Sequence, residues 1–389
     1  MSAAVVVVGA GPAGLATARA YRQAGGAHQV TLLAADPDPP YRRPPLSKEF
    51  LRGEMDRSAL PMEDPSFYAR EGIELRPGVR VEELDLDAHV LRTDAGEAVP
   101  FGACVLATGS EPIRLPIPGG DDPGLLLMRT ITDSERVAAA AAPGARVLVI
   151  GSGFIGCEAA ASVAMRGARV TLATDEVVPQ DNRLGAEVGH EIARWLTEYG
   201  VALRLGAAVE AIERRGGAFE VTLAGTAAPV EVDAVLCAAG VRPRTELAEA
   251  AGVRIEEGAV ATDEQMRCEA EGLWAVGDVA FARNGAARRP VRVEHWGDAL
   301  AHGEVAGRSL AGKEAAWNEL PGFWSTIGRR TLKYAAWGDG WDEVHVDRAG
   351  QAFTARYGRE GTIVGVLTHG RDEDYENERG FIERGTPLP

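Results

Sequence analysis

The chain has 389 residues, and 41 Lys and Arg against 57 Asp and Glu give it a formal net charge of −16. The fractions of hydrophobic residues (46%) and charged residues (25%) are typical of a globular protein, which excludes disordered, collagen-like and coiled-coil chains. The acidic balance argues against nucleic-acid binding, and no apolar run approaches the roughly 20 residues that span a bilayer. We expect two or three domains and, because the N-terminus shows no basic leader, a cytoplasmic location.

The first predicted unit begins at a short aliphatic run. Val5 to Val8 predict a buried parallel strand, and the glycine turn Gly9-Ala10-Gly11-Pro12-Ala13-Gly14 follows at once. A helix over 13–24 and a strand over 30–33 complete the unit. In such a turn the first glycine permits the bend, the second lets a pyrophosphate approach the backbone, and the third lets the helix pack on the sheet. Asp36, 22 residues beyond Gly14, is the candidate for the ribose hydroxyls.

The same unit recurs 142 residues later. Strand 147–150 leads into Gly151-Ser152-Gly153-Phe154-Ile155-Gly156, followed by a predicted helix over 155–166 and a strand over 169–173. Two glycine turns, each between a strand and a helix, predict two dinucleotide sites. In the second unit Thr174 stands where the ribose-binding acid is expected, with Asp175 and Glu176 after it. No arginine lies in this turn to meet a 2′-phosphate, so the sequence favours NADH without excluding NADPH.

The order of the strands predicts a domain inserted into another. Segments 105–109 and 236–240 each resemble a strand that returns to its sheet, and the whole second unit lies between them. Residues 273–278 then supply the last strand of the first domain. We therefore predict a first domain made of 1–110 and 245–317 and a second made of 111–244.

The four cysteines argue against a metal site or a redox disulfide. Cys104, Cys157, Cys237 and Cys268 lie 53, 80 and 31 residues apart, without a CxxC or zinc-ligand spacing. We expect buried thiols and no bound metal.

Several further motifs resemble one family. The chain resembles the two-dinucleotide-domain FAD/NAD(P) flavoproteins and, more narrowly, the NADH-dependent ferredoxin reductases that serve cytochromes P450 and ring-hydroxylating oxygenases. The resemblance rests on PPYRRPPLSK at 39–48, RTITD at 129–133, AVGD at 275–278 and RVEHW at 292–296. It implies an α/β fold of two Rossmann-like domains, the second inserted in the first, and a small C-terminal α+β domain over 318–389 that begins near Gly322-Phe323-Trp324-Ser325.

The resemblance also implies roles for individual residues. Lys48 would lie beside the isoalloxazine ring and pair with Glu158, and these two are the catalytic candidates. The candidates for FAD binding are Gly9, Gly11, Pro12, Ala13, Gly14, Asp36, Arg43, Lys48, Val81, Ala107, Thr108, Gly109, Arg129, Gly277, Asp278, Glu294, His295 and Trp296. The candidates for NAD(P)H binding are Gly151, Gly153, Phe154, Ile155, Gly156, Glu158, Thr174, Asp175 and Gly240.

The sequence around Lys48 favours outward electron flow. Disulfide reductases need two nearby cysteines over the flavin, whereas this stretch carries Pro44, Pro45 and Ser47. The resemblance therefore implies an oxidoreductase that takes electrons from NADH through FAD and passes them singly to a ferredoxin-type iron–sulfur protein, which supplies a P450 or an oxygenase. The alternative is an NADH-responsive signalling flavoprotein similar to apoptosis-inducing factor. One departure is Trp324-Ser325-Thr326-Ile327, where the group has a WSDQ-like segment.

A locally basic stretch is the candidate docking surface. Residues 283–333 contain nine basic and five acidic side chains, a charge of +4 within an acidic chain. Such a stretch could attract an acidic ferredoxin; scattered solvated arginines are the competing interpretation.

Overall fold

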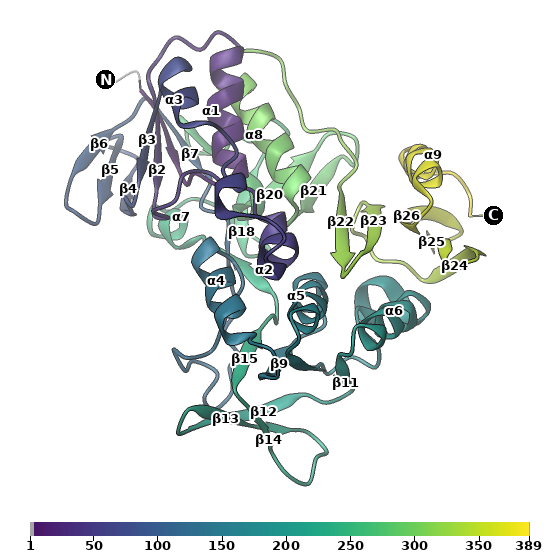
Figure 1. The fold of residues 1–389 in the computed structure, drawn as a ribbon. Coiled ribbons are helices and arrows are strands. Elements are labelled where there is room, and N and C mark those ends of the chain that lie inside the picture. The colour runs from purple at the N-terminus through teal and green to yellow at the C-terminus, as the bar shows by residue number, and fades with distance from the viewer. Residues whose placement is uncertain (1–3, 389) are drawn as a thin grey trace.

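The computed structural model describes residues 4–388 and has three lobes (Figure 1). The first lobe is built on a five-stranded parallel sheet in the order β19-β7-β1-β2-β3. Its strands are β1 (Val5–Val8), β2 (Val30–Ala34), β3 (Ile73–Pro77), β7 (Ala103–Leu106) and β19 (Leu273–Ala275). Strand β19, which the sequence predicts as the last strand of this domain, lies at one edge of the sheet, beside β7.

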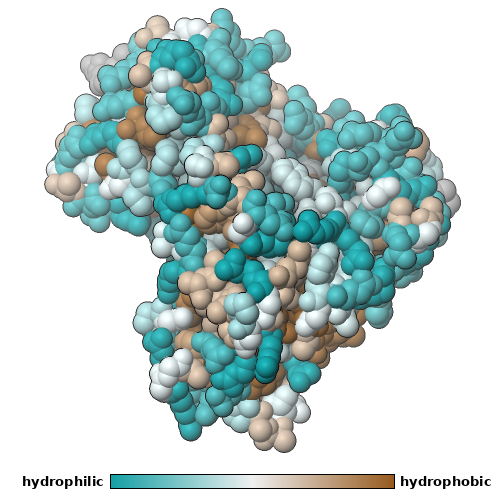
Figure 2. Space-filling view, viewed as in Figure 1, coloured by the Kyte–Doolittle hydropathy of each residue, from teal (hydrophilic) through white to brown (hydrophobic). Residues whose placement is uncertain are grey.

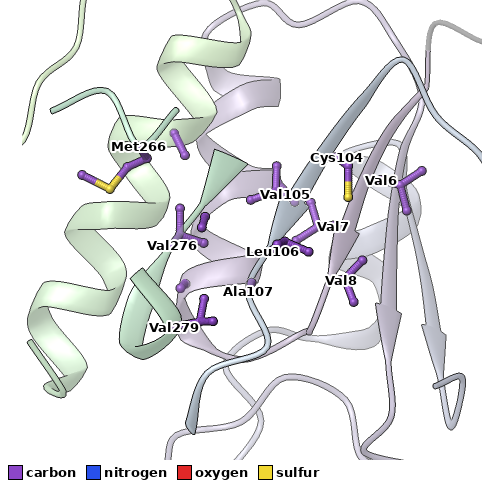
Figure 3. Close-up of a cluster of buried hydrophobic side chains, with 14 of the residues drawn as sticks. Val6, Val7, Val8, Cys104, Val105, Leu106, Ala107, Met266, Val276 and Val279 are labelled. Carbon is purple, nitrogen blue, oxygen red and sulfur yellow. The ribbon is translucent and has the colours of Figure 1, made fainter. Parts of the chain in front are cut away.

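Two helices of the first lobe lie against each other, α1 (Pro12–Gln23) and α8 (Trp296–Leu310). Glycine makes their close approach possible, because a Cβ at Gly303 would lie 2.3 Å from the Ala13 carbonyl oxygen and one at Gly307 would lie 2.4 Å from that of Thr17. Beside them the core is filled by aliphatic side chains of β1 and β7, together with Met266, Val276 and Val279 (Figure 3).

The second lobe repeats this plan with a four-stranded parallel sheet in the order β11-β10-β9-β15. Its strands are β9 (Arg146–Ile150), β10 (Arg169–Ala173), β11 (Ala202–Arg204) and β15 (Ala234–Cys237), and its main helices are α5 (Phe154–Met165) and α6 (Asp181–Glu198). Helices α1 and α5 begin directly after the second glycine of their turns, within one residue of the predicted positions.

The chain passes between the two lobes through a paired crossover. Strand β8 (Ser110–Pro112), where the chain leaves the first lobe, pairs antiparallel with β16 (Val241–Pro243), where it returns. The second sheet therefore lies within an insertion between β7 and β19. The domain boundaries at 110, 244 and 317 stay predictions.

The C-terminal lobe is an antiparallel sheet in the order β22-β23-β26-β25-β24, with α9 (Asp372–Glu383) against β26. Its strands are β22 (Gly322–Ile327), β23 (Arg330–Ala336), β24 (Glu343–Ala349), β25 (Ala352–Arg359) and β26 (Thr362–His369). We call it the C-terminal sheet. It contacts the second lobe at α6, where Arg330 pairs with Glu198 at 2.5 Å and the Tyr357 hydroxyl donates to the Leu184 carbonyl at 3.0 Å.

Shorter elements complete the chain. The helices are η1 (Pro44–Ser47), α2 (Glu49–Arg52), η2 (Arg57–Ala59), α3 (Pro65–Arg70), α4 (Ile131–Ala140), α7 (Glu246–Ala250) and η3 (Gly277–Val279). The strands are β4 (Val81–Asp85), β5 (Val90–Thr93), β6 (Ala98–Pro100), β12 (Val209–Arg215), β13 (Ala218–Leu223), β14 (Val230–Val232), β17 (Ile255–Glu256), β18 (Ala259–Thr262), β20 (Ala280–Asn284) and β21 (Arg289–Arg292).

Hydrophilic residues cover most of the face in Figure 2. Within residues 4–388, no helix has the length and apolar character required to cross a membrane.

Candidate functional site

One open cavity of about 1050 Å³ is lined by residues of all three lobes. It is bordered by both glycine turns, by the segment that carries Lys48 and by Phe323 and Trp324 of the C-terminal sheet. Every predicted cofactor-binding residue lines it except Gly14 and Gly156. Those two are the third glycines of their turns, whose expected task is close packing of helix and sheet.

The first glycine turn has the shape that a dinucleotide requires. A Cβ at Gly9 would lie 2.2 Å from the Ala107 carbonyl oxygen, and one at Gly14 would lie 2.0 Å from that of Gly9. A Cβ at Gly11, by contrast, would meet no atom within 4 Å. Gly9 and Gly14 are therefore needed by the fold, whereas Gly11 leaves free space in the cavity above the start of α1, where backbone N–H groups favour a phosphate.

The second turn has the same geometry. A Cβ at Gly151 would lie 2.5 Å from the Ala238 carbonyl oxygen and one at Gly156 would lie 2.1 Å from that of Gly151, but at Gly153 the nearest atom is 4.0 Å away. Both turns thus combine two sterically required glycines with one that faces open space. The residues present fit two dinucleotides, as the repeat in the sequence predicts.

Two arginines, Arg129 and Arg43, line the part of the cavity at the first glycine turn. Arg129 pairs with the buried Asp278 at 2.9 Å, and Ser110 donates to the same carboxylate at 2.6 Å. Burial alone would raise the pKa of Asp278, but Arg129 and Ser110 outweigh it and hold the pKa below its usual value. Arg43 donates to the Arg129 carbonyl oxygen and has no ion pair within residues 4–388. A guanidinium that has no ion-pair partner suits a pyrophosphate.

Two predicted motifs position these arginines. In the RTITD segment Thr130 and Asp133 form a capping box at the start of α4, which fixes the backbone beside Arg129. Asp36 follows β2, accepts a hydrogen bond from the Tyr41 hydroxyl at 2.7 Å and lines the cavity. The predicted ribose acid is thus held in place by the segment that carries Arg43.

The predicted catalytic pair is formed. Lys48 Nζ lies 2.6 Å from Glu158 Oε2, and the two residues are 6% and 2% exposed. Lys48 follows η1, whereas Glu158 lies on α5 of the second lobe, so the pair joins the two Rossmann-like units beside the cavity.

The end of β10 shows which acid faces the second glycine turn. Thr174 is buried, and its hydroxyl lies 3.0 Å from Ser152 Oγ. Asp175 is exposed, whereas Glu176 turns back so that Oε2 accepts from Ser152 Oγ at 2.5 Å and from the Gln180 N–H at 3.1 Å. Glu176, which our list of candidates omits, is therefore the acid held at the turn.

Gln180 adds an unsatisfied donor beside Glu176. It lines the cavity, is 4% exposed, adopts φ of +64°, and its Nε2 has no hydrogen-bond partner within the described chain. A buried amide without a partner is costly, so a ligand acceptor at this place fits the structure. Residue spacing does not show where a loop folds back through a left-handed residue. For this reason the sequence did not predict that Glu176 and Gln180 lie at the second glycine turn.

Aromatic rings border the cavity between the lobes. The ring of Phe323 lies 4.5 Å from that of Phe154 and 4.3 Å from that of His295. Burial, with the nearby Arg183, lowers the pKa of His295 to about 4, so this imidazole is neutral at pH 7. No pattern in the sequence predicts that Phe323 and Trp324 line the cavity, since they lie in the C-terminal sheet, far along the chain from both glycine turns.

The cysteines are all free thiols. Burial raises the pKa of Cys237 to about 11 and that of Cys268 to about 12, and it raises those of Cys104 and Cys157 further. Since the thiolate is the reactive form, these thiols are poorly suited to disulfide chemistry, although Cys237 lines the cavity.

Comparisons with known proteins place the chain in a family. A family model described as pyridine nucleotide-disulphide oxidoreductase matches residues 3–303. The chain belongs to this family. Membership confirms the predicted oxidoreductase class, with FAD and a pyridine nucleotide as cofactors. The two Rossmann-like sheets and the glycine turns fall within the matched residues.

Similar family members are named ferredoxin reductases, which confirms the resemblance stated from the motifs. A "Ferredoxin--NAD(P)(+) reductase" of a Sphingomonas species is 31% identical, with 97% of this chain and 92% of that one covered. The "5,5'-dehydrodivanillate O-demethylase ferredoxin reductase subunit" of a Sphingobium species is 33% identical, with 98% and 93% covered.

Solved structures agree with the predicted α/β fold. The structure titled as the covalent putidaredoxin reductase–putidaredoxin complex has a TM-score of 0.92 at 28% identity and covers 99% of this chain and 94% of that one. The ferredoxin reductase for the CYP199A2 system of Rhodopseudomonas palustris has a TM-score of 0.93 at 27% identity, with 99% and 95% covered.

Proposed function

We propose that this protein is an NADH-dependent flavoprotein reductase that passes electrons one at a time to a ferredoxin-type iron–sulfur protein, which in turn supplies a P450 or an oxygenase. FAD occupies the first glycine turn and NADH the second. When bound, FAD supplies acceptance of a hydride from NADH and delivery of single electrons. The proposal includes a cytoplasmic location and the division into domains 1–110 with 245–317, 111–244 and 318–389.

The observation that carries the proposal is the single cavity bordered by both glycine turns, with the Lys48–Glu158 pair beside it. The arrangement lets two dinucleotides approach each other in one space, as transfer between them requires. Lys48 places a cation where charge develops on a reduced flavin, and Arg43 offers its charge to the FAD pyrophosphate. The predicted binding roles of the other cavity residues belong to the proposal.

NADH is the proposed coenzyme because a carboxylate is fixed beside the second glycine turn. Glu176 accepts from Ser152 and from the N–H groups of Gln180 and Asn182. A carboxylate has about four acceptor positions, so it retains capacity for a ribose hydroxyl, and its charge opposes a 2′-phosphate.

The iron–sulfur partner is inferred from the relatives and from the absence of a redox disulfide among the four cysteines.

Docking near residues 283–333 stays part of the proposal. Trp324, 45% exposed, lies in this stretch and lines the cavity. Most of the basic side chains there are already paired with carboxylates, namely Arg283, Arg289, Arg292, Arg329, Arg330 and Lys333. The surface is therefore less basic than the sequence count of +4 implies. The comparisons give the signalling alternative no support.

The decisive experiment is a carrier assay on the FAD-loaded protein. We expect NADH to reduce a [2Fe–2S] ferredoxin catalytically, and faster than it reduces dithiol or disulfide acceptors. Efficient turnover with a disulfide acceptor and none with any iron–sulfur protein would refute the proposal.

A further inference from the structure

Glu158 is a point at which all three lobes meet through hydrogen bonds. Its Oε2 accepts from Ser47 Oγ at 2.5 Å and from Lys48 Nζ at 2.6 Å, both from the first lobe. Its Oε1 accepts from Ser325 Oγ at 2.8 Å and from the Thr326 N–H at 3.2 Å, both on β22 of the C-terminal sheet. Glu158 itself belongs to α5 of the second lobe.

The residues that form these hydrogen bonds are buried, so the loss of any one of the bonds is energetically costly. Ser325 is 1% exposed, Ser47 2% and Glu158 2%. A carboxylate shut away from water depends on the donors that face it, and loss of one leaves an oxygen that water does not readily satisfy. On the Oε1 side the shorter of the two contacts is the Ser325 hydroxyl.

We propose that Ser325 is a positioning residue through which the C-terminal sheet fixes the Glu158–Lys48 pair in the cavity. The inference rests on the proposed function, because it concerns the charge that this pair presents to bound FAD. Ser325 holds one oxygen of Glu158 so that the other stays directed at Lys48. Lys48 Nζ has its only further hydrogen bond within the described chain to Ser47 Oγ, at 3.2 Å, so its position depends mainly on Glu158.

Removal of the Ser325 hydroxyl has a defined electrostatic consequence. The hydroxyl directs the positive end of its dipole at Oε1 and offsets part of the carboxylate charge. Without it the pair is more negative and less rigid, so the Lys48 cation stabilises the reduced cofactor less. Hydride acceptance then becomes slower and thermodynamically less favourable, while the coenzyme site around Gly153 and Glu176 is unchanged.

The test compares Ser325→Ala with Thr354→Val. Thr354 is also buried in the C-terminal sheet, and its hydroxyl donates to a carboxylate, that of Asp374, at 2.7 Å, but it does not line the cavity. Both variants lose one hydroxyl–carboxylate hydrogen bond, so both lose stability. We expect only Ser325→Ala to shift the FAD midpoint potential to more negative values and to slow cofactor reduction by NADH about tenfold, a factor that matches a lost hydrogen bond to a charged group.

Two further variants keep the test decisive. Ser325→Thr retains the hydroxyl and should restore the potential. Ser325→Cys is similar in size to serine but is a weaker donor, so it should shift the potential less, in the same direction. It replaces Ser325→Ala as the test variant if Ser325→Ala fails to fold. The KM for NADH should stay within about twofold in all of them. Folded Ser325→Ala with the potential and reduction rate of Thr354→Val would overturn the inference. Failure of the unmodified holoprotein to be reduced by NADH would instead refute the proposed function.

Discussion

The hydroxyl of Ser152 donates to the Glu176 carboxylate over 2.5 Å. This contact links the middle of the second glycine turn to the loop after β10, and it places an acid beside the proposed NADH site. Asp175, one residue earlier, is exposed, and its side chain forms no hydrogen bond or ion pair within residues 4–388.

Glu176→Gln should weaken discrimination between NADH and NADPH. The amide keeps the size of the side chain but removes the charge that opposes a 2′-phosphate. We expect the ratio of kcat/KM for NADH to that for NADPH to fall about tenfold or more, as for loss of one charge-assisted contact. Glu187→Gln is the matched control, because Glu187 is exposed on α6 and does not line the cavity; it should leave the ratio within about twofold. An equal effect of the two substitutions would show that Glu176 has no special role.

Gly11→Ala should fold and lose affinity for FAD. Its φ of −75° suits alanine, and the added methyl meets no protein atom, so it enters the space proposed for the pyrophosphate. We expect FAD affinity to fall at least about tenfold, measured by flavin fluorescence on protein whose circular dichroism is unchanged. Gly14→Ala, in contrast, should destabilise the fold, because its Cβ would lie 2.0 Å from the Gly9 oxygen. Unaltered FAD affinity in Gly11→Ala would exclude this turn as the site.

Gly153→Ala should separate the two sites. The protein should bind FAD normally and remain yellow, because the first turn is untouched, but the KM for NADH should rise about tenfold or more. Steady-state kinetics and flavin absorbance measure both effects on one sample. Loss of FAD with an unchanged KM would reverse our assignment of the two turns.

Lys48→Met should slow cofactor reduction more than it weakens FAD binding. Methionine retains the apolar stem but not the cation, and it leaves the buried Glu158 without its charged partner. We expect the limiting rate of reduction by NADH to fall about tenfold to a hundredfold, with FAD affinity changed by no more than about threefold. Lys313→Met, at an exposed lysine outside the cavity, should leave the rate of reduction by NADH and the FAD affinity unchanged. Unchanged reduction kinetics would reject the role of Lys48.

Asp298→Asn should stabilise the protein at neutral pH. Burial, reinforced by Glu319 and opposed by Arg379 and the Gly322 N–H, raises the pKa of Asp298 to about 7, and its Oδ2 has no partner within the described chain. Between the unfolded pKa near 4 and the folded pKa near 7 the unfolded state loses its proton first, so stability falls as the pH rises. The advantage of asparagine should therefore grow by about 2–4 kcal/mol from pH 4 to pH 7.5 in urea unfolding.

Glu304→Gln is the control for this pH dependence, because Glu304 is exposed on the same helix. Its difference in unfolding free energy from the unmodified protein should be flat across this range. A flat difference for Asp298→Asn as well would mean that the Asp298 carboxyl titrates alike in the folded and unfolded states.

Local signals explain which parts of the fold and site the sequence predicts. Strand 5–8 and the turn after it are fixed by consecutive aliphatic residues and by Gly9 and Gly14, where a Cβ would meet backbone atoms, so the prediction is accurate to one residue. The return of β19 to the first sheet follows from the inserted unit, whereas its edge position was not predicted. The Lys48–Glu158 contact, 110 residues apart, came from the family resemblance and not from any local pattern.

Contacts that form where the chain folds back onto the site could not be predicted from the sequence. Glu176 reaches Ser152 because the loop turns through Gln180 at a positive φ, which a spacing rule does not contain. Ser325 reaches Glu158 across 167 residues only because the C-terminal sheet lies against α5 and α6. The charge of residues 283–333 was overestimated because the acids that pair with its arginines lie mostly outside the stretch, as Glu54 and Glu198 do.

Stopped-flow mixing of the FAD-loaded protein with NADH, and then of the reduced protein with an oxidised [2Fe–2S] ferredoxin, follows the electrons through both transfers. We expect the flavin absorbance to bleach at one NADH per FAD and then to return as two ferredoxins are reduced for each NADH consumed. A flavin that NADH does not bleach, or one whose electrons appear in titratable thiols and not in the iron–sulfur centre, would contradict it.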